Sequence, residues 1–166
     1  MNTFLLYLVG GFVHCLPSTR CFYLKRQLYK LAGVKIGKNV RIASSVTIIG
    51  NGHLTIGDNT WIGHQVLICC SDKISIGKDC DIAPRVYIGN GTHEIETQGI
   101  KAAGKGCSLP ITIGDGCWIC ANCAILPSTV IGSCSIIAAG AVVKGEIPAR
   151  QLWGGAPARI IRNLKE

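Results

Sequence analysis

The 166-residue sequence lacks several features that would assign it to common protein classes. Its one strongly apolar stretch, residues 3–16, has only about thirteen such residues, and a membrane-spanning helix needs about twenty. The start of the chain has no basic segment and no obvious small-residue cleavage site, so no secretory signal peptide is predicted. The sequence therefore favours a cytoplasmic protein without a transmembrane helix.

Acidic residues are also scarce. Lys and Arg number 17 against 9 Asp and Glu, which gives a formal net charge of +8. The basic residues are spread along the chain, without the dense run or the interleaved aromatics of a nucleic-acid surface. We therefore predict no nucleic-acid partner. The charge is compatible with an anionic membrane or with a pocket for a phosphate-rich cofactor.

Isoleucine, by contrast, is abundant and periodic. From residue 113 to residue 143 an aliphatic residue returns every six positions, and the residue four places after each of the first five is small or short. Neither an α-helix nor a two-sided strand has this period. A flat-sided coil of short strands has it, if each six-residue unit makes one side and one corner. The aliphatic positions are Ile113, Ile119, Ile125, Ile131, Ile137 and Val143.

The same phase extends towards the N-terminus. The dipeptides Ile36-Gly37, Ile56-Gly57 and Ile76-Gly77 repeat at twenty residues, which is three sides of six plus two extra corner residues. Three sides per coil predict a triangular prism whose coils stack at about the 4.8 Å spacing of neighbouring strands. We therefore expect a single all-β domain with one core, formed by residues 34–148.

Several of the ten cysteines fit this repeat. Cys80, Cys117 and Cys123 occupy the small position, and Cys120 follows an aliphatic one. The spacing Cys117-x2-Cys120-x2-Cys123 resembles a metal motif, but the repeat already requires small residues there. We predict no metal site, and reduced thiols that point to the cytoplasm.

Residues 1–33 precede the repeat. Pro17 ends the apolar stretch, and Ser18 or Thr19 is positioned to cap a second helix running from about Arg20 to Leu31. Two helices here would cover the open first coil of the prism. Alternatively, residues 1–31 would make a peripheral contact with the inner face of an anionic membrane, and both roles are compatible.

The repeat stops at Ile88 and resumes at Ile111 or Ile113. The segment between them, residues 90–110, is polar and glycine-rich and contains His93. Long loops on rigid scaffolds commonly carry function, so His93 is the candidate catalytic residue. After the repeat, residues 149–166 are expected to form a helical tail, in which Arg159 and Arg162 would share a face.

Three segments resemble the sugar O-acetyltransferase branch of the hexapeptide-repeat acyltransferases, which includes maltose, galactoside and nodulation-factor acetyltransferases. They read YIGNGTHEIE before a loop closed by LPITIGDGCWI, then CWICANCAILPSTVIGSCSIIAAGAVVKGEIP, then GGAPARIIR. The resemblance covers about residues 34–164. It implies a left-handed parallel β-helix, acetyl-CoA as co-substrate, and a homotrimer with its active sites between neighbouring prisms. The handedness comes from the family and not from the spacing.

The resemblance also implies roles for single residues. His93 matches the catalytic histidine, which would act as a general base on the acceptor hydroxyl. The other matches are to the coenzyme site: Ala121, Ala139 and Lys144 match positions lining the acetyl-CoA channel, and Arg159 and Arg162 match basic residues near its phosphates.

The sequence departs from the family at the acceptor site. An Asn that binds acceptor one coil before the loop is absent from WIGHQVLICC, where His64 or Gln65 would replace it, and Glu94 is a further candidate for acceptor binding. The acidic helical region of the maltose and galactoside enzymes is absent too. The apolar, basic start is more like the enzymes of polysaccharide gene clusters, which favours a surface-polysaccharide precursor as acceptor.

Other functions remain open at this stage. A serine- or antibiotic-type acetyltransferase would differ only in its acceptor, and a non-catalytic β-helix scaffold would neither bind coenzyme A (CoA) nor need His93. A γ-class carbonic anhydrase needs three His ligands on zinc, two of them close in sequence. The four histidines of this chain are all more than ten residues apart, which argues against that class.

Overall fold

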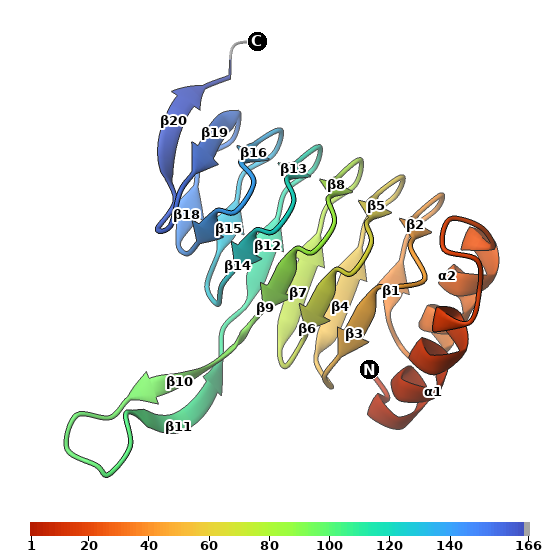
Figure 1. Cartoon of the computed structure of the whole chain (residues 1–166), viewed down its shortest axis with the longest axis horizontal. Coiled ribbons are helices and arrows are strands. Elements are labelled where there is room, and N and C mark those ends of the chain that lie inside the picture. Colours follow the sequence, from red (N-terminus) through yellow and green to blue (C-terminus); the bar gives the residue numbers. More distant parts are fainter. Residues whose placement is uncertain (165–166) are drawn as a thin grey trace.

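Residues 1–164 are described by a computed structural model, which shows a prism of stacked three-sided coils with two helices over its first coil (Figure 1). The parallel β-helix predicted from the isoleucine phase is confirmed. The helices are α1 (Thr3–His14) and α2 (Phe22–Leu31). No helix in residues 1–164 combines the length and apolarity needed to cross a membrane.

Each side of the prism is one sheet, in which every strand pairs with the strand one coil away, in parallel apart from the last pair of face B. Face A has the order β1-β4-β7-β12-β15-β18, face B β2-β5-β8-β13-β16-β19-β20, and face C β17-β14-β9-β6-β3. The bounds in face A are β1 (Lys35–Ile36), β4 (His53–Ile56), β7 (Lys73–Ile76), β12 (Ile111–Ile113), β15 (Val130–Ile131) and β18 (Glu146–Ile147). Those in face B are β2 (Arg41–Ile42), β5 (Trp61–Ile62), β8 (Asp81–Ile82), β13 (Trp118–Ile119), β16 (Ile136–Ile137), β19 (Gln151–Gly154) and β20 (Arg159–Asn163). Those in face C are β3 (Thr47–Ile49), β6 (Leu67–Cys69), β9 (Tyr87–Gly89), β14 (Ala124–Ile125) and β17 (Val142–Val143).

The core is a set of aliphatic columns along the prism axis. Pairing in face B aligns one isoleucine per coil, and each of these side chains is buried. Because the paired strands also carry the buried isoleucines, apolar burial and backbone pairing stabilise the same short strands. The residues of this column are Ile42, Ile62, Ile82, Ile119 and Ile137.

The glycine after the aliphatic residue is required by close stacking. A Cβ at Gly57 would lie 2.5 Å from the backbone nitrogen of Lys78 in the next coil. Real Cβ atoms do not approach backbone so closely, so the Ile-Gly dipeptide recurs where successive coils are in closest contact.

The small position of the repeat is also a hydrogen-bond donor. Thr60 Oγ1 donates to the Gly77 carbonyl at 2.8 Å, and Cys123 Sγ donates to the Ala138 carbonyl at 3.0 Å. Burial raises the pKa of the Cys123 thiol, which keeps it protonated and able to donate. This explains why cysteine, threonine and serine are interchangeable here. The same kind of bond to the next coil is made by Cys80, Cys117, Thr129 and Ser135.

Two helices occupy residues 1–33 as predicted, but the cap of the second helix was predicted wrongly. The N-cap of α2 is Cys21, in a left-handed conformation (φ 54°) and without a side-chain cap bond. Neither Ser18 nor Thr19 caps it. The Ser18 carbonyl instead accepts hydrogen bonds from Lys25 Nζ (2.8 Å) and from the backbone N–H of Ser44 (3.1 Å), which ties the interhelical segment to the first coil.

The C-terminal segment is a strand, so the predicted helical tail was wrong. After the turn around Gly155, β20 pairs antiparallel with β19 on face B (Figure 1). The last parallel strand would otherwise leave unpaired backbone groups at its edge, and the returning chain satisfies them. Arg159 and Arg162 therefore lie on an exposed strand with a register shift, and not on one face of a helix. Residues 165–166 of the predicted tail lie outside the described residues.

Candidate active site

The segment that interrupts the repeat is a β-hairpin arm that projects from the prism (Figure 1). Its strands are β10 (Gly91–Ile95) and β11 (Ala103–Ser108), and it leaves the corner between face C and face A. The prism continues in register across the insertion, because Ile76 pairs with Ile113 and Ile88 pairs with Ile125. The arm is thus anchored to a scaffold that does not change shape around it.

Asn90 fixes the base of the arm. Its side chain is fully buried, and its Oδ1 accepts a hydrogen bond from the backbone N–H of Ser71 at 2.8 Å. Its Nδ2 donates to the Lys73 carbonyl at 3.3 Å, and its own carbonyl accepts from the Leu109 N–H at 2.9 Å. One residue therefore joins both strands of the arm to the preceding coil.

His93 lies three residues beyond this anchor, in β10, with an exposed side chain. It pairs across the hairpin with Gly106, and a Cβ on that glycine would lie 3.9 Å from His93 Nε2. The missing side chain leaves open space beside the imidazole. Glu94, the next residue along the strand, is exposed and by strand alternation faces the other side of the hairpin.

The residues predicted to line the coenzyme channel fall at two corners that border face C. Ala121 and Ala139 lie on consecutive coils at the corner between faces B and C, where the Gly140 N–H donates to the Ala121 carbonyl at 2.9 Å. Lys144 is exposed at the corner between faces C and A, two coils beyond the corner that carries the arm. These three residues therefore flank the same face.

The C-terminal turn closes over the last strand of face C. The Val142 N–H donates to the Gly155 carbonyl at 3.0 Å, and the Ala158 N–H donates to the Val142 carbonyl at 2.8 Å. Arg159 follows directly and is exposed, as is Arg162. The turn thus brings two guanidinium groups to the end of the prism where Ala139 and Lys144 lie.

His64 and Gln65 lie apart from His93 within one chain. They occupy the corner between faces B and C, whereas the arm leaves the corner between faces C and A. His64 Nδ1 hydrogen bonds with Ser18 Oγ at 3.1 Å, and the Gln65 N–H donates to Ser45 Oγ at 3.0 Å. In the isolated chain these bonds connect the N-terminal segment and the first two coils. Their assignment to acceptor binding stays a prediction.

Within residues 1–164 no three potential metal ligands (His, Cys, Asp or Glu) cluster around a common point. Cys117 and Cys123 direct their thiols at backbone carbonyls of the next coil, and Cys120 lies between them at a corner. The thiols of Cys117 and Cys123 in the Cys-x2-Cys-x2-Cys motif therefore take part in the stacking of the coils.

Comparison with known proteins agrees with the stacked coils. Residues 110–145 match the family model for the bacterial transferase hexapeptide (six repeats). A relative in Escherichia coli (strain K12), whose name assigns it provisionally as an acetyltransferase of colanic acid biosynthesis, is 34% identical over 139 residues, which are 84% of this chain and 74% of that protein.

Solved structures of acetyltransferases have the same fold over nearly the whole chain. A Vibrio cholerae hexapeptide-repeat acetyltransferase, crystallised with acetyl coenzyme A, aligns with a TM-score of 0.72 and 25% identity over 97% of this chain and 88% of that one. A galactoside acetyltransferase in complex with coenzyme A aligns with a TM-score of 0.75 and 28% identity over 99% and 79% of the two chains.

Fold and repeat together define a hexapeptide-type β-helix transferase. The chain belongs to the hexapeptide-repeat acyltransferase family and is an enzyme of its acetyltransferase group.

Asn90 was not predicted from the sequence. The only signal was its place directly after Gly89, where the isoleucine phase breaks. Burial of an asparagine at that point cannot be deduced from periodicity, because polar residues at a break are usually solvated.

Proposed function

We propose that this enzyme transfers the acetyl group of acetyl-CoA to a hydroxyl group of a sugar in a surface-polysaccharide precursor. The proposal is supported by the relatives named for colanic acid and galactoside acetylation and by an exposed histidine on a rigidly anchored arm. The single observation that carries it is the placement of His93 beside the open space left by Gly106.

In the proposed reaction, the neutral imidazole of His93 accepts the proton of the acceptor hydroxyl as its oxygen attacks the thioester carbonyl. The tetrahedral intermediate collapses with cleavage of the carbon–sulfur bond, and the imidazolium returns the proton to the CoA thiolate. General-base assistance of this kind contributes roughly 10²–10⁴-fold. Transfer is direct within a ternary complex, so none of the cysteines carries the acyl group.

The coenzyme would lie along the part of face C nearest the C-terminus. Arg159 and Arg162 are exposed and carry the charge that suits the 3′-phosphate and pyrophosphate of CoA. Ala121 and Ala139 present small side chains at the bordering corner, which leaves room for the pantetheine arm. Lys144, at the corner shared with the arm, would contact the coenzyme between its phosphates and its acetyl group.

We propose a homotrimer. The side chains that point outwards from face C are partly buried, mostly apolar and aligned on successive strands, which suits packing against a second prism. His64 and Gln65 are on a different corner from His93, so they would reach an acceptor only in a neighbouring copy. Glu94 faces the other side of the hairpin from His93, so it too would reach only an acceptor held by a neighbouring copy. The outward residues of face C include Leu67, Tyr87, Ala124 and Val142.

The test is acetyl-CoA turnover, measured by thiol release after subtraction of the protein's own cysteines. The panel contains sugars, nucleotide-sugars, serine and aminoglycosides, and it compares wild type, His93→Ala and His53→Ala. His53 is the matched control, since it is an exposed histidine on the prism.

The proposal predicts that His93→Ala lowers kcat at least about a hundredfold while the protein still binds CoA. The His53→Ala variant keeps full activity. Equal turnover of wild type and His93→Ala would show that His93 is not the base. Turnover with serine or an aminoglycoside alone would replace the sugar by that acceptor, and a failure to bind CoA would leave a scaffold function.

We further propose a cytoplasmic location. Each of the ten cysteines is free, and several are buried in the repeat, where a disulfide would displace the bonds to backbone carbonyls.

A further inference from the structure

The outward surface of α1 is apolar although no part of residues 1–164 covers it. Leu6, Val9 and Val13 face the prism and are buried. On the opposite side Phe4 is 73% exposed and Phe12 is 53% exposed, and no charged residue occurs between Thr3 and Val13. A helix that is apolar on all sides is normally buried on all sides. The outer face of α1 therefore lacks a partner among the described residues of the chain.

The second helix, α2, also exposes apolar side chains on its outer face. In α2 a charged residue, Lys25, is buried, and an apolar residue, Leu31, is 71% exposed. Lys25 Nζ is satisfied by the carbonyls of Pro17 (3.0 Å), Ser18 (2.8 Å) and Ile42 (3.3 Å). The apolar residues left on the outer face are Tyr23, Leu24 and Leu31.

Almost all of the net charge of the protein is in the same part of the chain. Residues 1–57 contain seven Lys and Arg residues and no Asp or Glu, whereas residues 58–166 contain ten basic and nine acidic residues. The basic residues are spread along the whole sequence, but the acidic residues are not. Exposed positive side chains near the helices are Arg20, Lys30, Lys35 and Lys38.

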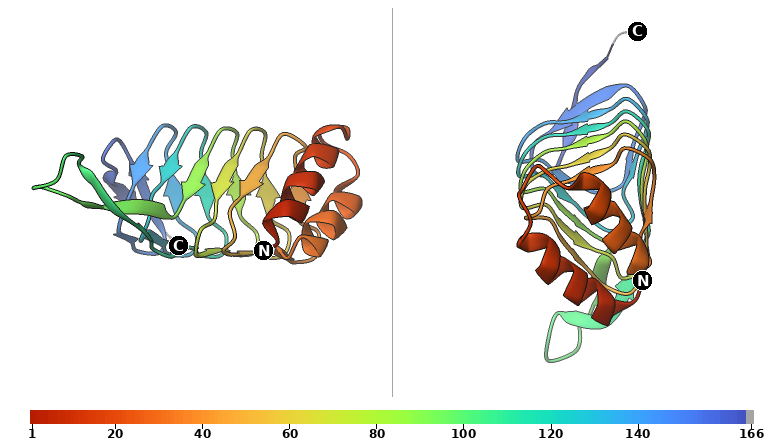
Figure 2. Two further views of the ribbon diagram at one scale, coloured as in Figure 1. Left: turned by 90° about the horizontal axis from the view of Figure 1, so that it is seen from below. Right: turned by 90° about the vertical axis from the view of Figure 1, so that its right-hand side faces the viewer.

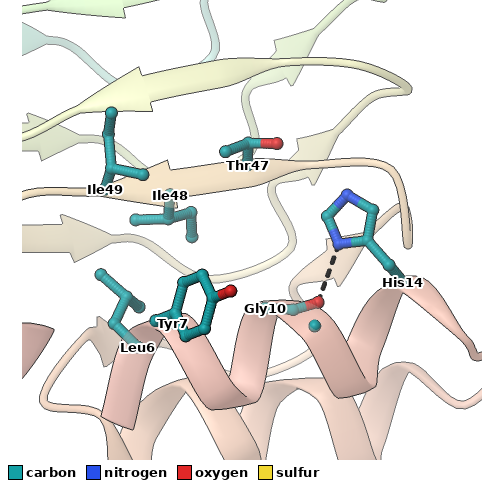
Figure 3. A pocket seen from close by; sticks show the side chains of 8 residues that line it. Leu6, Tyr7, Gly10, His14, Thr47, Ile48 and Ile49 are labelled. Atoms are coloured by element: carbon teal, nitrogen blue, oxygen red, sulfur yellow. Dashed lines mark hydrogen bonds between the residues drawn. The ribbon is translucent and has the colours of Figure 1, made fainter. Parts of the chain in front are cut away.

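Both helices lie over the N-terminal end of the prism, side by side, with the coils behind them (Figure 2). We call their outward surface, formed by Phe4, Tyr7, Leu8, Phe12, Tyr23, Leu24 and Leu31, the cap surface. It continues into an apolar groove of about 270 Å³ between α1 and β3, where Tyr7 lies opposite Ile48 and Ile49 (Figure 3).

We propose that the cap surface docks the enzyme peripherally on an anionic lipid bilayer. Exposed phenylalanine, tyrosine and leucine side chains would insert at the headgroup boundary, and the surrounding lysines and arginines would pair with anionic headgroups. Neither helix is long enough to cross the bilayer, so the contact is interfacial. The docking does not depend on the reaction; its use in presenting the arm to a membrane-borne acceptor rests on the proposed function.

A second copy of the chain is a poorer occupant for this surface. Two cap surfaces facing one another would bring together two segments that each carry seven basic and no acidic residues. Such a contact would be opposed by like charges, whereas an anionic bilayer offers the opposite charge together with an apolar interior.

The test is flotation of the full chain with vesicles of phosphatidylcholine alone or with 30% phosphatidylglycerol. We expect at least about tenfold stronger binding to the anionic vesicles, and a loss of that difference in 0.5 M NaCl, where charges are screened. Phe4→Ser combined with Phe12→Ser should reduce binding at least about tenfold, and Arg20→Gln and Lys30→Gln about fivefold each. The matched control is Ile100→Ser, an exposed apolar residue at the tip of the arm.

Absence of binding to anionic vesicles, or equal binding by wild type and the Phe4/Phe12 variant, would overturn the proposal. A change of oligomeric state in that variant, measured by light scattering, would identify the cap surface as a contact between chains and would overturn it too. Turnover of a soluble acceptor separates the two proposals. Vesicle binding without turnover leaves docking intact and removes the enzyme function, and turnover without vesicle binding does the reverse.

Discussion

Asn90 Oδ1 and the backbone N–H of Ser71, 2.8 Å apart, join the base of the hairpin arm to the coil beneath it. Because Asn90 is buried, its replacement would leave backbone groups of Ser71 and Lys73 without partners. Each such group costs about 1–3 kcal/mol when it stays dry. The position of His93 therefore depends on a buried asparagine at the base of the arm.

Asn90→Ala is expected to lower the free energy of unfolding by about 1–3 kcal/mol and to lower kcat, while the KM for acetyl-CoA is unchanged. Denaturant unfolding and steady-state kinetics measure the two effects. The control is Gln98→Ala, on the exposed part of the arm, which should alter neither. A variant with normal kcat would show that the arm holds its position without this anchor.

Gly106→Val would fill the space beside the His93 imidazole. A Cβ there is in ordinary van der Waals contact with Nε2 at 3.9 Å, so the fold tolerates it, but the branched methyl groups extend further towards the ring. We expect a fall in kcat of at least about tenfold, with a melting temperature close to that of wild type. Gly106→Ala should be milder. Equal activity of all three proteins would place the acceptor on the other side of the ring.

Arg159→Ala and Arg162→Ala should weaken binding of CoA about 10–100-fold, as expected for loss of a charge-assisted hydrogen bond to a phosphate. Dephospho-CoA, which lacks the 3′-phosphate, identifies the contact. A variant that has lost its bond to that phosphate binds CoA and dephospho-CoA equally, whereas wild type prefers CoA. Calorimetric titration with both ligands gives the comparison. If each variant keeps the preference of wild type, the phosphate is bound elsewhere.

Tyr29→Phe is expected to leave stability unchanged or to raise it by up to about 1–2 kcal/mol. The Tyr29 hydroxyl is buried and has no hydrogen-bond partner within residues 1–164, and burial raises its pKa to about 12. Since phenylalanine removes only the unsatisfied oxygen, thermal unfolding should move upwards or not at all. A clear loss of stability would indicate that an ordered water molecule serves the hydroxyl.

The prism was predictable because its constraint is local and repeats. Ile56 and Ile76 are each followed by glycine, and the same step recurs along the chain, so the spacing alone gives the three-sided coil. The location of the arm followed from the break in that phase. His93 was assigned from the resemblance and from its place in the break, and its role is not yet tested.

The errors arose where tertiary contacts outweighed local pattern. The three-residue spacing of Arg159 and Arg162 fits a helix, but the open edge of β19 offered backbone partners that only a strand could use. Lysine is a residue type that is usually solvated, yet the carbonyls of the interhelical segment and of Ile42 provide Lys25 with a buried site. Neither the edge nor the carbonyls can be seen in a single-sequence pattern.

The unbroken register of Ile76 with Ile113 and of Ile88 with Ile125 has a consequence for how such enzymes diversify. The arm is an insertion between β9 and β12, which would follow one another directly in the sequence without it. Its length and sequence can therefore change while the coils keep their stacking. Selectivity for the acceptor can then evolve in the arm independently of the surfaces proposed for the coenzyme. For protein engineering, the base at Asn90 and Leu109 marks the two positions between which an arm from another enzyme would be grafted.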